Sequence, residues 1–282
     1  MGCFVESVYV TLQQRYAVCR LGFNAGNRAG GIRVWLQSLN TVLISIVIPA
    51  FNEEKLLPTT LAAIAKARTA FEPLGWSSEV IVCDNNSSDQ TAAVARNAGA
   101  TVVFEPVNQI GRARNTGAAG ARGDWLVFID ADSQPSVELL AEMAARIARG
   151  RVIAGGAAIE LDESGGWVRL ATALWSCWSR LARHMAGSFI FVDAQAFRDL
   201  GGFSEHLFAG EELDLSQRLK NLAASKHRTV EIIARPRLLT SARKVKLYTP
   251  REFFWFFFRA VFRPRRMLSD REACHMWYDG RR

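Results

Sequence analysis

The sequence predicts an α/β fold in which a mainly parallel sheet is flanked by helices. Apolar, β-branched runs alternate with segments of helical spacing from residue 44 onward, the pattern of a parallel sheet with both faces covered. Polar clusters follow three of these runs, and the 282 residues are 49% hydrophobic, enough to bury a sizeable core. We therefore expect one large domain, or two small ones, that bind a ligand at the carboxyl edge of the sheet.

The first half of the chain gives the clearest elements. Residues 44–48 form a β-branched run closed by Pro49, and residues 56–70 have helical spacing with little to break it. Gly99 stands where a helix over residues 90–98 would end. The other expected elements are strands over 80–83, 101–104 and 125–129 and a helix over 111–121.

The second half, from about residue 151, is less regular. Residues 1–40 show weak periodicity and indicate an irregular leader, and residues 246–282 indicate a basic, aromatic-rich C-terminal helix. The predicted organisation is a leader (1–40), a folded domain (41–245, with halves 41–150 and 151–245) and a C-terminal segment (246–282). The expected elements of the second half are helices over 167–185 and 210–222 and strands over 189–192 and 230–233.

Charge and cysteine content limit the possible compartments. Net charge is +8, but residues 235–282 hold thirteen Lys or Arg against four Asp or Glu, so the basicity belongs to the tail. The five cysteines form no C-x-x-C pair, which favours a reducing compartment. No apolar stretch reaches the roughly 20 residues that span a bilayer, the N-terminus lacks a signal-peptide pattern, and Glu6 breaks the myristoylation pattern. We expect a cytoplasmic protein, soluble or peripheral at the inner face of the cell membrane.

The most informative feature is Asp130-Ala131-Asp132, directly after the apolar run 125–129. Two carboxylates one residue apart repel each other and are costly to desolvate unless a cation or hydrogen-bond donors offset their charge. A divalent metal that carries a phosphorylated ligand is the natural partner. Two further polar clusters, at 52–54 and 84–89, follow the first and second strands, and three clusters at one edge predict a site.

Five motifs follow one another along the chain. They are Ser45-Ile-Val-Ile-Pro-Ala-Phe-Asn-Glu-Glu54, Asp84-Asn-Asn-Ser-Ser-Asp89, Gly111-Arg-Ala-Arg-Asn-Thr-Gly117, Gly201-Gly-Phe-Ser-Glu205 and Gly210-Glu-Glu-Leu-Asp-Leu215. In this order they resemble glycosyltransferase family 2, of the GT-A fold group, over residues 44–243. The resemblance implies a GT-A type nucleotide-binding domain, with a nucleotide-sugar half over 41–150 and an acceptor half over 151–245.

The resemblance also implies roles for individual residues. Asp84 and the loop of Glu53 contact the base and ribose, Asp130 touches the ribose or sugar, and Asp132 ligates Mn²⁺ or Mg²⁺ on the diphosphate. Pro49, Ala50 and Ala131 complete the implied nucleotide-sugar contacts. Arg114 and Arg243 are candidates for phosphate binding, since guanidinium groups bind phosphate oxygens as a fork. None of the four histidines falls where many relatives have an additional ligand.

The base for the acceptor hydroxyl is expected at Glu212, where the family usually has Asp after Glu. The predicted function is a metal-dependent inverting glycosyltransferase that moves one sugar from a nucleoside diphosphate sugar to a hydroxyl acceptor, such as a lipid-linked or cell-envelope glycan precursor. Processive synthesis is not expected, because the Gln-x-x-Arg-Trp signature is absent after Glu212. No nucleic-acid partner is expected.

Several alternatives stay open on the sequence alone. Asp130 and Asp132 could form a capped turn before a helix that begins at Pro135. Glu211 and Glu212 could simply be favourable charge in a first helical turn. The aromatic and basic run 250–266 fits either a helix buried on the domain or a segment at a membrane surface. The rival functions are a nucleotidyltransferase, whose glycine-rich loop is missing after the first strand, and a catalytically silent binding protein with the same fold.

Overall fold

The computed structural model describes residues 41–162, 184–185, 187–243 and 268–274. The expected leader, the tryptophan-containing helix over 167–185 and most of the C-terminal segment therefore lie outside the described residues. The described strands are β1 (Leu43–Ala50), β2 (Ser77–Asp84), β3 (Thr101–Phe104), β4 (Trp125–Ile129), β5 (Ser133–Gln134), β6 (Val152–Leu161), β7 (Phe189–Asp193) and β8 (Thr229–Thr240). The described helices are α2 (Leu57–Ala67), the 3₁₀ helix η1 (Arg68–Leu74), α3 (Thr91–Asn97), α4 (Ile110–Ala119), α5 (Val137–Ala148), α7 (Ala194–Asp199) and α8 (Glu211–Ser225).

The strands form one sheet in the order β3-β2-β1-β4-β7-β6-β8-β5. The half β3-β2-β1-β4 is parallel throughout, as the alternation of strands and helices predicts. Strand β7 runs antiparallel to both β4 and β6, and β5 runs antiparallel to β8, so the sheet as a whole is mixed. The α/β fold with flanking helices is confirmed, and the parallel arrangement holds best on the side that carries the three polar clusters.

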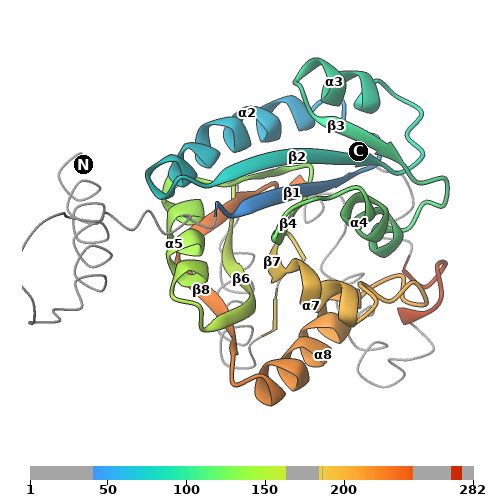
Figure 1. Cartoon of the computed structure of the whole chain (residues 1–282). Helices are drawn as coiled ribbons and strands as arrows, with labels where there is room; N and C mark the ends of the chain where they lie inside the picture. The colour runs from blue at the N-terminus through green and yellow to red at the C-terminus, as the bar shows by residue number, and fades with distance from the viewer. Residues whose placement is uncertain (1–40, 163–183, 186, 244–267, 275–282) are drawn as a thin grey trace, which may run out of the picture.

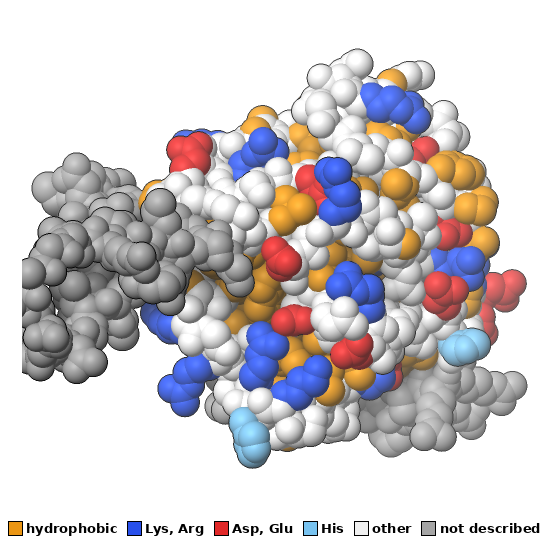
Figure 2. Space-filling view, viewed as in Figure 1, with side chains coloured by type: hydrophobic (Ala, Val, Ile, Leu, Met, Phe, Trp, Pro, Cys, Tyr) orange, Lys and Arg blue, Asp and Glu red, His pale blue; other side chains and the backbone are white. Residues whose placement is uncertain are grey.

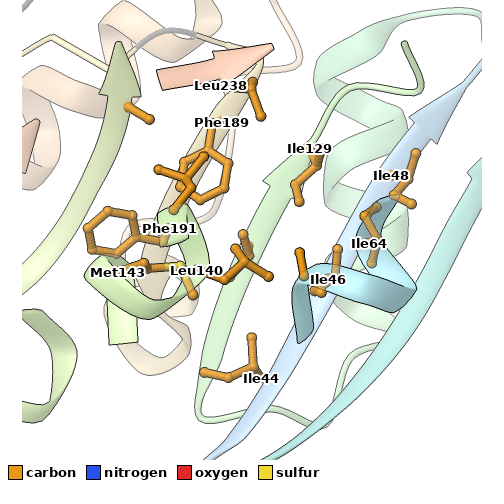
Figure 3. Packing of buried hydrophobic residues seen from close by; sticks show 14 of the residues in the cluster. Ile44, Ile46, Ile48, Ile64, Ile129, Leu140, Met143, Phe189, Phe191 and Leu238 are labelled. Carbon is orange, nitrogen blue, oxygen red and sulfur yellow. The ribbon is translucent and has the colours of Figure 1, made fainter. Parts of the chain in front are cut away.

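Helices cover both faces of this sheet (Figure 1). Ile44, Ile46 and Ile48 of β1 face α2 and α5 on one side, where Ile64 and Met143 close the layer (Figure 3). Residues of the opposite parity point to a second cluster beneath α7 and α8, which includes Val47, Phe128, Phe203 and Leu215. Alternate residues of β1 point to opposite faces of the sheet. Because both faces are covered, nearly every residue of this strand is buried.

The structure changes several expected elements. The 101–104 and 125–129 strands are confirmed as β3 and β4, whereas the 56–70 helix is α2 followed by a 3₁₀ turn. The 210–222 helix is α8, which extends to Ser225. Three elements were not expected: the ten-residue strand β6, the short β5 and helix α7. The last strand is also much longer than the predicted 230–233, since β8 continues to Thr240.

The face drawn in Figure 2 carries charged side chains of both signs. On the face drawn in Figure 2, Asp and Glu side chains are interspersed with Lys and Arg among the described residues. None of the described helices is both long and apolar enough to cross a bilayer. The short C-terminal stretch 268–274 lies on the domain, where the Leu268 carbonyl accepts a hydrogen bond from the Phe208 amide at 2.7 Å.

Candidate active site

The loops after β1 and β2 are tied to each other at the carboxyl edge of the sheet. Asn52, which has a left-handed backbone at φ 52°, accepts a hydrogen bond from the Ser88 amide at 2.8 Å through its side-chain oxygen. The Glu53 amide donates to the Thr91 hydroxyl at 2.8 Å, and the Glu54 carboxylate accepts from the Gln90 amide at 3.0 Å. The polar clusters 52–54 and 84–89 thus build one wall together.

Asp84 lies in this wall at the end of β2. Its side chain is largely buried and accepts a hydrogen bond from the Ser87 amide at 3.1 Å. Ala50 pairs with Asp84 across the β1–β2 ladder and Pro49 pairs with Cys83, so both predicted contacts from β1 lie beside Asp84.

Glu53, Arg243 and Asp132 come together from three distant parts of the chain. The Arg243 guanidinium binds both oxygens of Glu53, at 2.7 and 3.1 Å, and lies 3.6 Å from Asp132. Asp132 also accepts from the Thr240 hydroxyl at 3.5 Å. The carboxylates of Glu53 and Asp132 thus share the positive charge of the Arg243 guanidinium. Ala131, between the two aspartates, is buried, and its carbonyl accepts from the Thr60 hydroxyl at 2.8 Å.

Arg114 is buried between two carboxylates, Asp130 and Glu211. Its side chain on α4 is 1% exposed, and its fork donates to Glu211 at 2.7 Å, to Asp130 at 3.0 Å and to the Gly187 carbonyl at 3.0 Å. Burial alone would lower the pKa of Arg114, but Asp130, Glu211 and Glu212 outweigh burial and raise it. In this structure the Arg114 guanidinium is directed at carboxylates, and Arg243 is the arginine beside the predicted metal ligand. The phosphate contact expected of Arg114 stays a prediction.

Glu212 stands at the start of α8, next to this buried network. Its side chain is partly buried, and desolvation, reinforced by the neighbouring carboxylate of Glu211, raises the pKa of Glu212 to about 8, against the lowering effect of Arg114. Glu211 is buried and paired with Arg114, which leaves Glu212 as the member of the doublet suited to exchange a proton near neutral pH.

The carboxylates of the site fit a metal ion that is coordinated mainly by the phosphate oxygens of a bound nucleotide. Among the residues that the structure describes, no three His, Cys, Asp or Glu side chains gather so as to hold an ion by themselves. A single carboxylate such as Asp132, with phosphate oxygens completing the shell, matches the preference of Mg²⁺ or Mn²⁺. The geometry is therefore compatible with a cation that arrives with a diphosphate.

Two participants were missing from the sequence-based site. Glu211 was not among the expected site residues, although its direct ion pair with Arg114 makes it part of the network. Gly187 gave no signal, because its contribution is a backbone carbonyl next to a stretch without a clear pattern. A side chain at position 187 would place its Cβ 3.2 Å from an Arg114 terminal nitrogen and 3.8 Å from the Glu212 carboxyl carbon.

The mixed sheet, its interlocked loops and the acidic helix start define a glycosyltransferase of the GT-A type. Residues 45–199 match the family model for glycosyl transferase family 2. The chain belongs to glycosyltransferase family 2, which confirms the resemblance seen in the five motifs.

Curated relatives match part of the chain. An uncharacterized glycosyltransferase of Mycobacterium tuberculosis is 36% identical over 113 residues, which are 40% of this chain and 47% of the relative. The undecaprenyl-phosphate 4-deoxy-4-formamido-L-arabinose transferase of Pseudomonas aeruginosa is 32% identical over 144 residues, 47% of this chain and 40% of that protein. The chain thus matches less than half the length of these relatives.

Solved structures share the fold at low identity. The mannosyltransferase PcManGT from Pyrobaculum calidifontis, in complex with GDP-Man and Mn²⁺, has a TM-score of 0.60 and 18% identity, covering 83% of this chain and 65% of that one. Glucosyl-3-phosphoglycerate synthase from Mycobacterium tuberculosis, in complex with Mn²⁺ and UDP, has a TM-score of 0.53 and 21% identity over 84% of each chain. These likenesses establish the GT-A fold.

Proposed function

We propose that this protein is a metal-dependent, inverting glycosyltransferase that moves a single sugar from a nucleoside diphosphate sugar to a hydroxyl acceptor. The observation that carries the proposal is the geometry of the Arg114 pairs, which link Asp130, directly after β4, to Glu211 and so bring Glu212 to the carboxyl edge of the sheet. Burial raises the pKa of Glu212 to about 8. A carboxylate with a pKa near the working pH is a strong yet available general base. Family membership supports the reaction class.

The proposed reaction is one displacement at the anomeric carbon. The acceptor oxygen forms a bond to this carbon while the carbon–oxygen bond to the diphosphate breaks, and the electron pair leaves with the phosphate oxygen. Glu212 takes the proton of the acceptor hydroxyl as the new bond forms. Attack opposite to the departing diphosphate inverts the anomeric configuration.

The donor is proposed to lie over the strand ends of β1, β2 and β4. Asp84 and the Glu53 loop are suited to the base and ribose, since carboxylates accept hydrogen bonds from imide N–H groups and hydroxyls. Asp130 and Ala131 would border the sugar, and Arg243 would turn from Glu53 toward the diphosphate. Asp132 would hold Mg²⁺ or Mn²⁺, which supplies positive charge to the leaving diphosphate when bound.

The acceptor is proposed to be lipid-linked. One relative is named for transfer involving undecaprenyl phosphate, and the tail concentrates basic and aromatic residues in the sequence 250–266. Such a segment would suit the anionic surface of the inner face of a cell membrane. The chain would then act in the cytoplasm, peripherally at that surface, on a precursor of a cell-envelope glycan.

A thermal-shift panel tests the donor site. Wild type, Asp132→Ala and the control Asp199→Ala, a surface carboxylate on α7, are melted with UDP, GDP and other nucleoside diphosphates, with Mn²⁺ or with EDTA. Ligand at about 100 times its Kd should add ~2.7 kcal/mol, a shift of several degrees. We expect a Mn²⁺-dependent shift with one nucleotide in the wild type and in Asp199→Ala, lost in Asp132→Ala. No shift with any nucleotide would contradict the proposal and favour a silent binding protein.

A further inference from the structure

The strongest unassigned feature is the way Arg114 joins two sides of the site. Its fork reaches Glu211, next to the proposed base, and Asp130, on the proposed donor side, with one terminal nitrogen each. Asp130 directly follows β4 and Glu211 begins α8, so these two carboxylates come from parts of the chain far apart in sequence. Arg114 itself comes from α4, a third element.

This arrangement needs an arginine rather than any cation. A planar fork can satisfy two carboxylates and a carbonyl at fixed directions, whereas a lysine ammonium is a single point of charge. The Phe203 ring lies 5.3 Å from the guanidinium carbon, and the Nε of Arg114 is buried without a hydrogen-bond partner. A buried group with an unmet donor is costly, so packing alone does not explain this residue.

Glu212 lies near the same guanidinium, which acts on it through charge. An ideal Cβ on Gly187 would lie 3.2 Å from one Arg114 terminal nitrogen and 3.8 Å from the Glu212 carboxyl carbon, so both side chains border the backbone of Gly187. The Ser216 hydroxyl donates to the Glu212 carbonyl at 2.7 Å and accepts from the Met185 amide at 3.0 Å, which fixes the backbone of the first turn of α8 to the same segment.

We infer that Arg114 is a positioning residue that holds the base Glu212 and the donor-side Asp130 in one fixed relation, with Glu211 as its anchor. The inference rests on the proposed function. In this role Arg114 aligns the transferred sugar with the incoming hydroxyl. It does not bind the phosphates of the donor. The charged groups that act on Glu212 are Arg114 and Glu211, with opposite effects on its protonation.

The test compares Arg114→Lys and Glu211→Gln with the wild type in Mn²⁺-dependent hydrolysis of GDP-mannose and UDP-glucose, in which water replaces the acceptor hydroxyl. We expect Arg114→Lys to lower kcat by roughly 10- to 100-fold and to move the rising limb of the pH profile to higher pH. Glu211→Gln removes a like charge and should move this limb to lower pH. Affinity for UDP or GDP with Mn²⁺ should stay within about 2-fold in both variants, because neither residue is assigned to phosphate.

Arg218→Lys is the matched control. Arg218 also donates a fork, to Asp214 and to the carbonyls of Leu200 and Gly202, but it lies one helical turn and more beyond Glu212 on α8. Its replacement should leave the pH limb in place. If Arg114→Lys matches this control in kcat and pH limb, or if it weakens nucleotide binding at least 10-fold, the inference is overturned.

A second measurement does not depend on turnover. The melting temperatures of the wild type and of Arg114→Lys are each compared with those of the same protein carrying Glu212→Gln, from pH 5 to pH 9. The pH at which the two melting temperatures diverge reports the ionisation of Glu212. Arg114→Lys should shift this divergence to higher pH. If Glu212→Gln leaves hydrolysis unchanged, the proposed function fails. If Glu212→Gln abolishes hydrolysis while Arg114→Lys shifts neither the pH limb nor the stability difference, only the role of Arg114 fails.

Discussion

Glu212 should weaken the fold at high pH. Its pKa in the folded protein is about 8, raised by burial and by Glu211 from an ordinary value of 4.5. The folded state therefore binds this proton more tightly than the unfolded state, and the resulting stability is complete below about pH 4.5 and is lost as pH rises through 8. We expect Glu212→Gln to melt like the wild type at pH 5 and several degrees higher at pH 9. A wild type that is the more stable protein at pH 9 would contradict this environment for Glu212.

The acidic residues of the site could be predicted from the sequence, but their partners could not. Asp84, Asp130 and Asp132 follow strand ends, a relation that is local and readable. The pairing of Arg243 with Glu53 spans 190 residues, and that of Arg114 with Glu211 spans 97. Such pairings depend on sheet order, which periodicity does not encode. The sequence therefore suggested phosphate binding for both arginines without revealing the carboxylates that they bind in this structure.

The parallel half of the sheet was predictable because its strands carry strong signals. Strands β3 and β4 are apolar, largely β-branched or aromatic, and bounded by glycine or polar residues. Strand β6 was missed because its centre reads Ala154-Gly-Gly-Ala157, residues with weak strand propensity. A Cβ at Gly155 would lie 2.4 Å from the Phe191 ring, so close packing, a tertiary requirement, selects glycine there.

Gly117 allows helix α4 to pack close to strand β1. A Cβ at Gly117 would lie 2.4 Å from Cγ1 of Val47 on β1, too close for any ordinary contact. We expect Gly117→Ala to lower the free energy of unfolding by about 1–3 kcal/mol through overpacking. Chemical denaturation measures this change.

Gly120→Ala, at the end of the same helix, is the control. Its nearest contact would be Val103 at 3.4 Å with an ordinary backbone, so the substitution should be neutral or slightly stabilising. Equal effects at positions 117 and 120 would show that α4 can move away from β1 without cost.

The folded domain should be independent of the leader. The described fold begins at residue 41, and the Leu43 amide is already fixed by the Asp124 carboxylate at 2.9 Å. We predict that a chain shortened to begin at residue 41 keeps its melting temperature within about 2 °C and its nucleotide-dependent shift. Loss of solubility, or a drop of more than 5 °C, would mean that residues 1–40 contribute to the fold.

Membrane binding by the tail calls for substitutions rather than deletion. Removing residues 250–282 would also remove Leu268 and its bond to Phe208. Replacing Arg263, Arg265 and Arg266 by Gln leaves Leu268 in the chain and should lower the binding constant for anionic vesicles by roughly 100-fold, at about 1 kcal/mol per basic residue near the surface. Equal binding by both proteins, at low and at physiological salt, would contradict the proposed surface contact.

The hydrogen bond from the Phe208 amide to the Leu268 carbonyl provides a probe of the loop 208–210, which leads to the Glu211–Glu212 doublet. Leu268 also lies against Gly210, directly before the Glu211–Glu212 doublet. The Phe208 amide is consequently a natural reporter: its hydrogen-exchange rate follows the opening of the C-terminal turn from the loop that leads to the base. An acceptor that orders this loop would slow the exchange of one backbone proton, and so reveal its own binding before any product is formed.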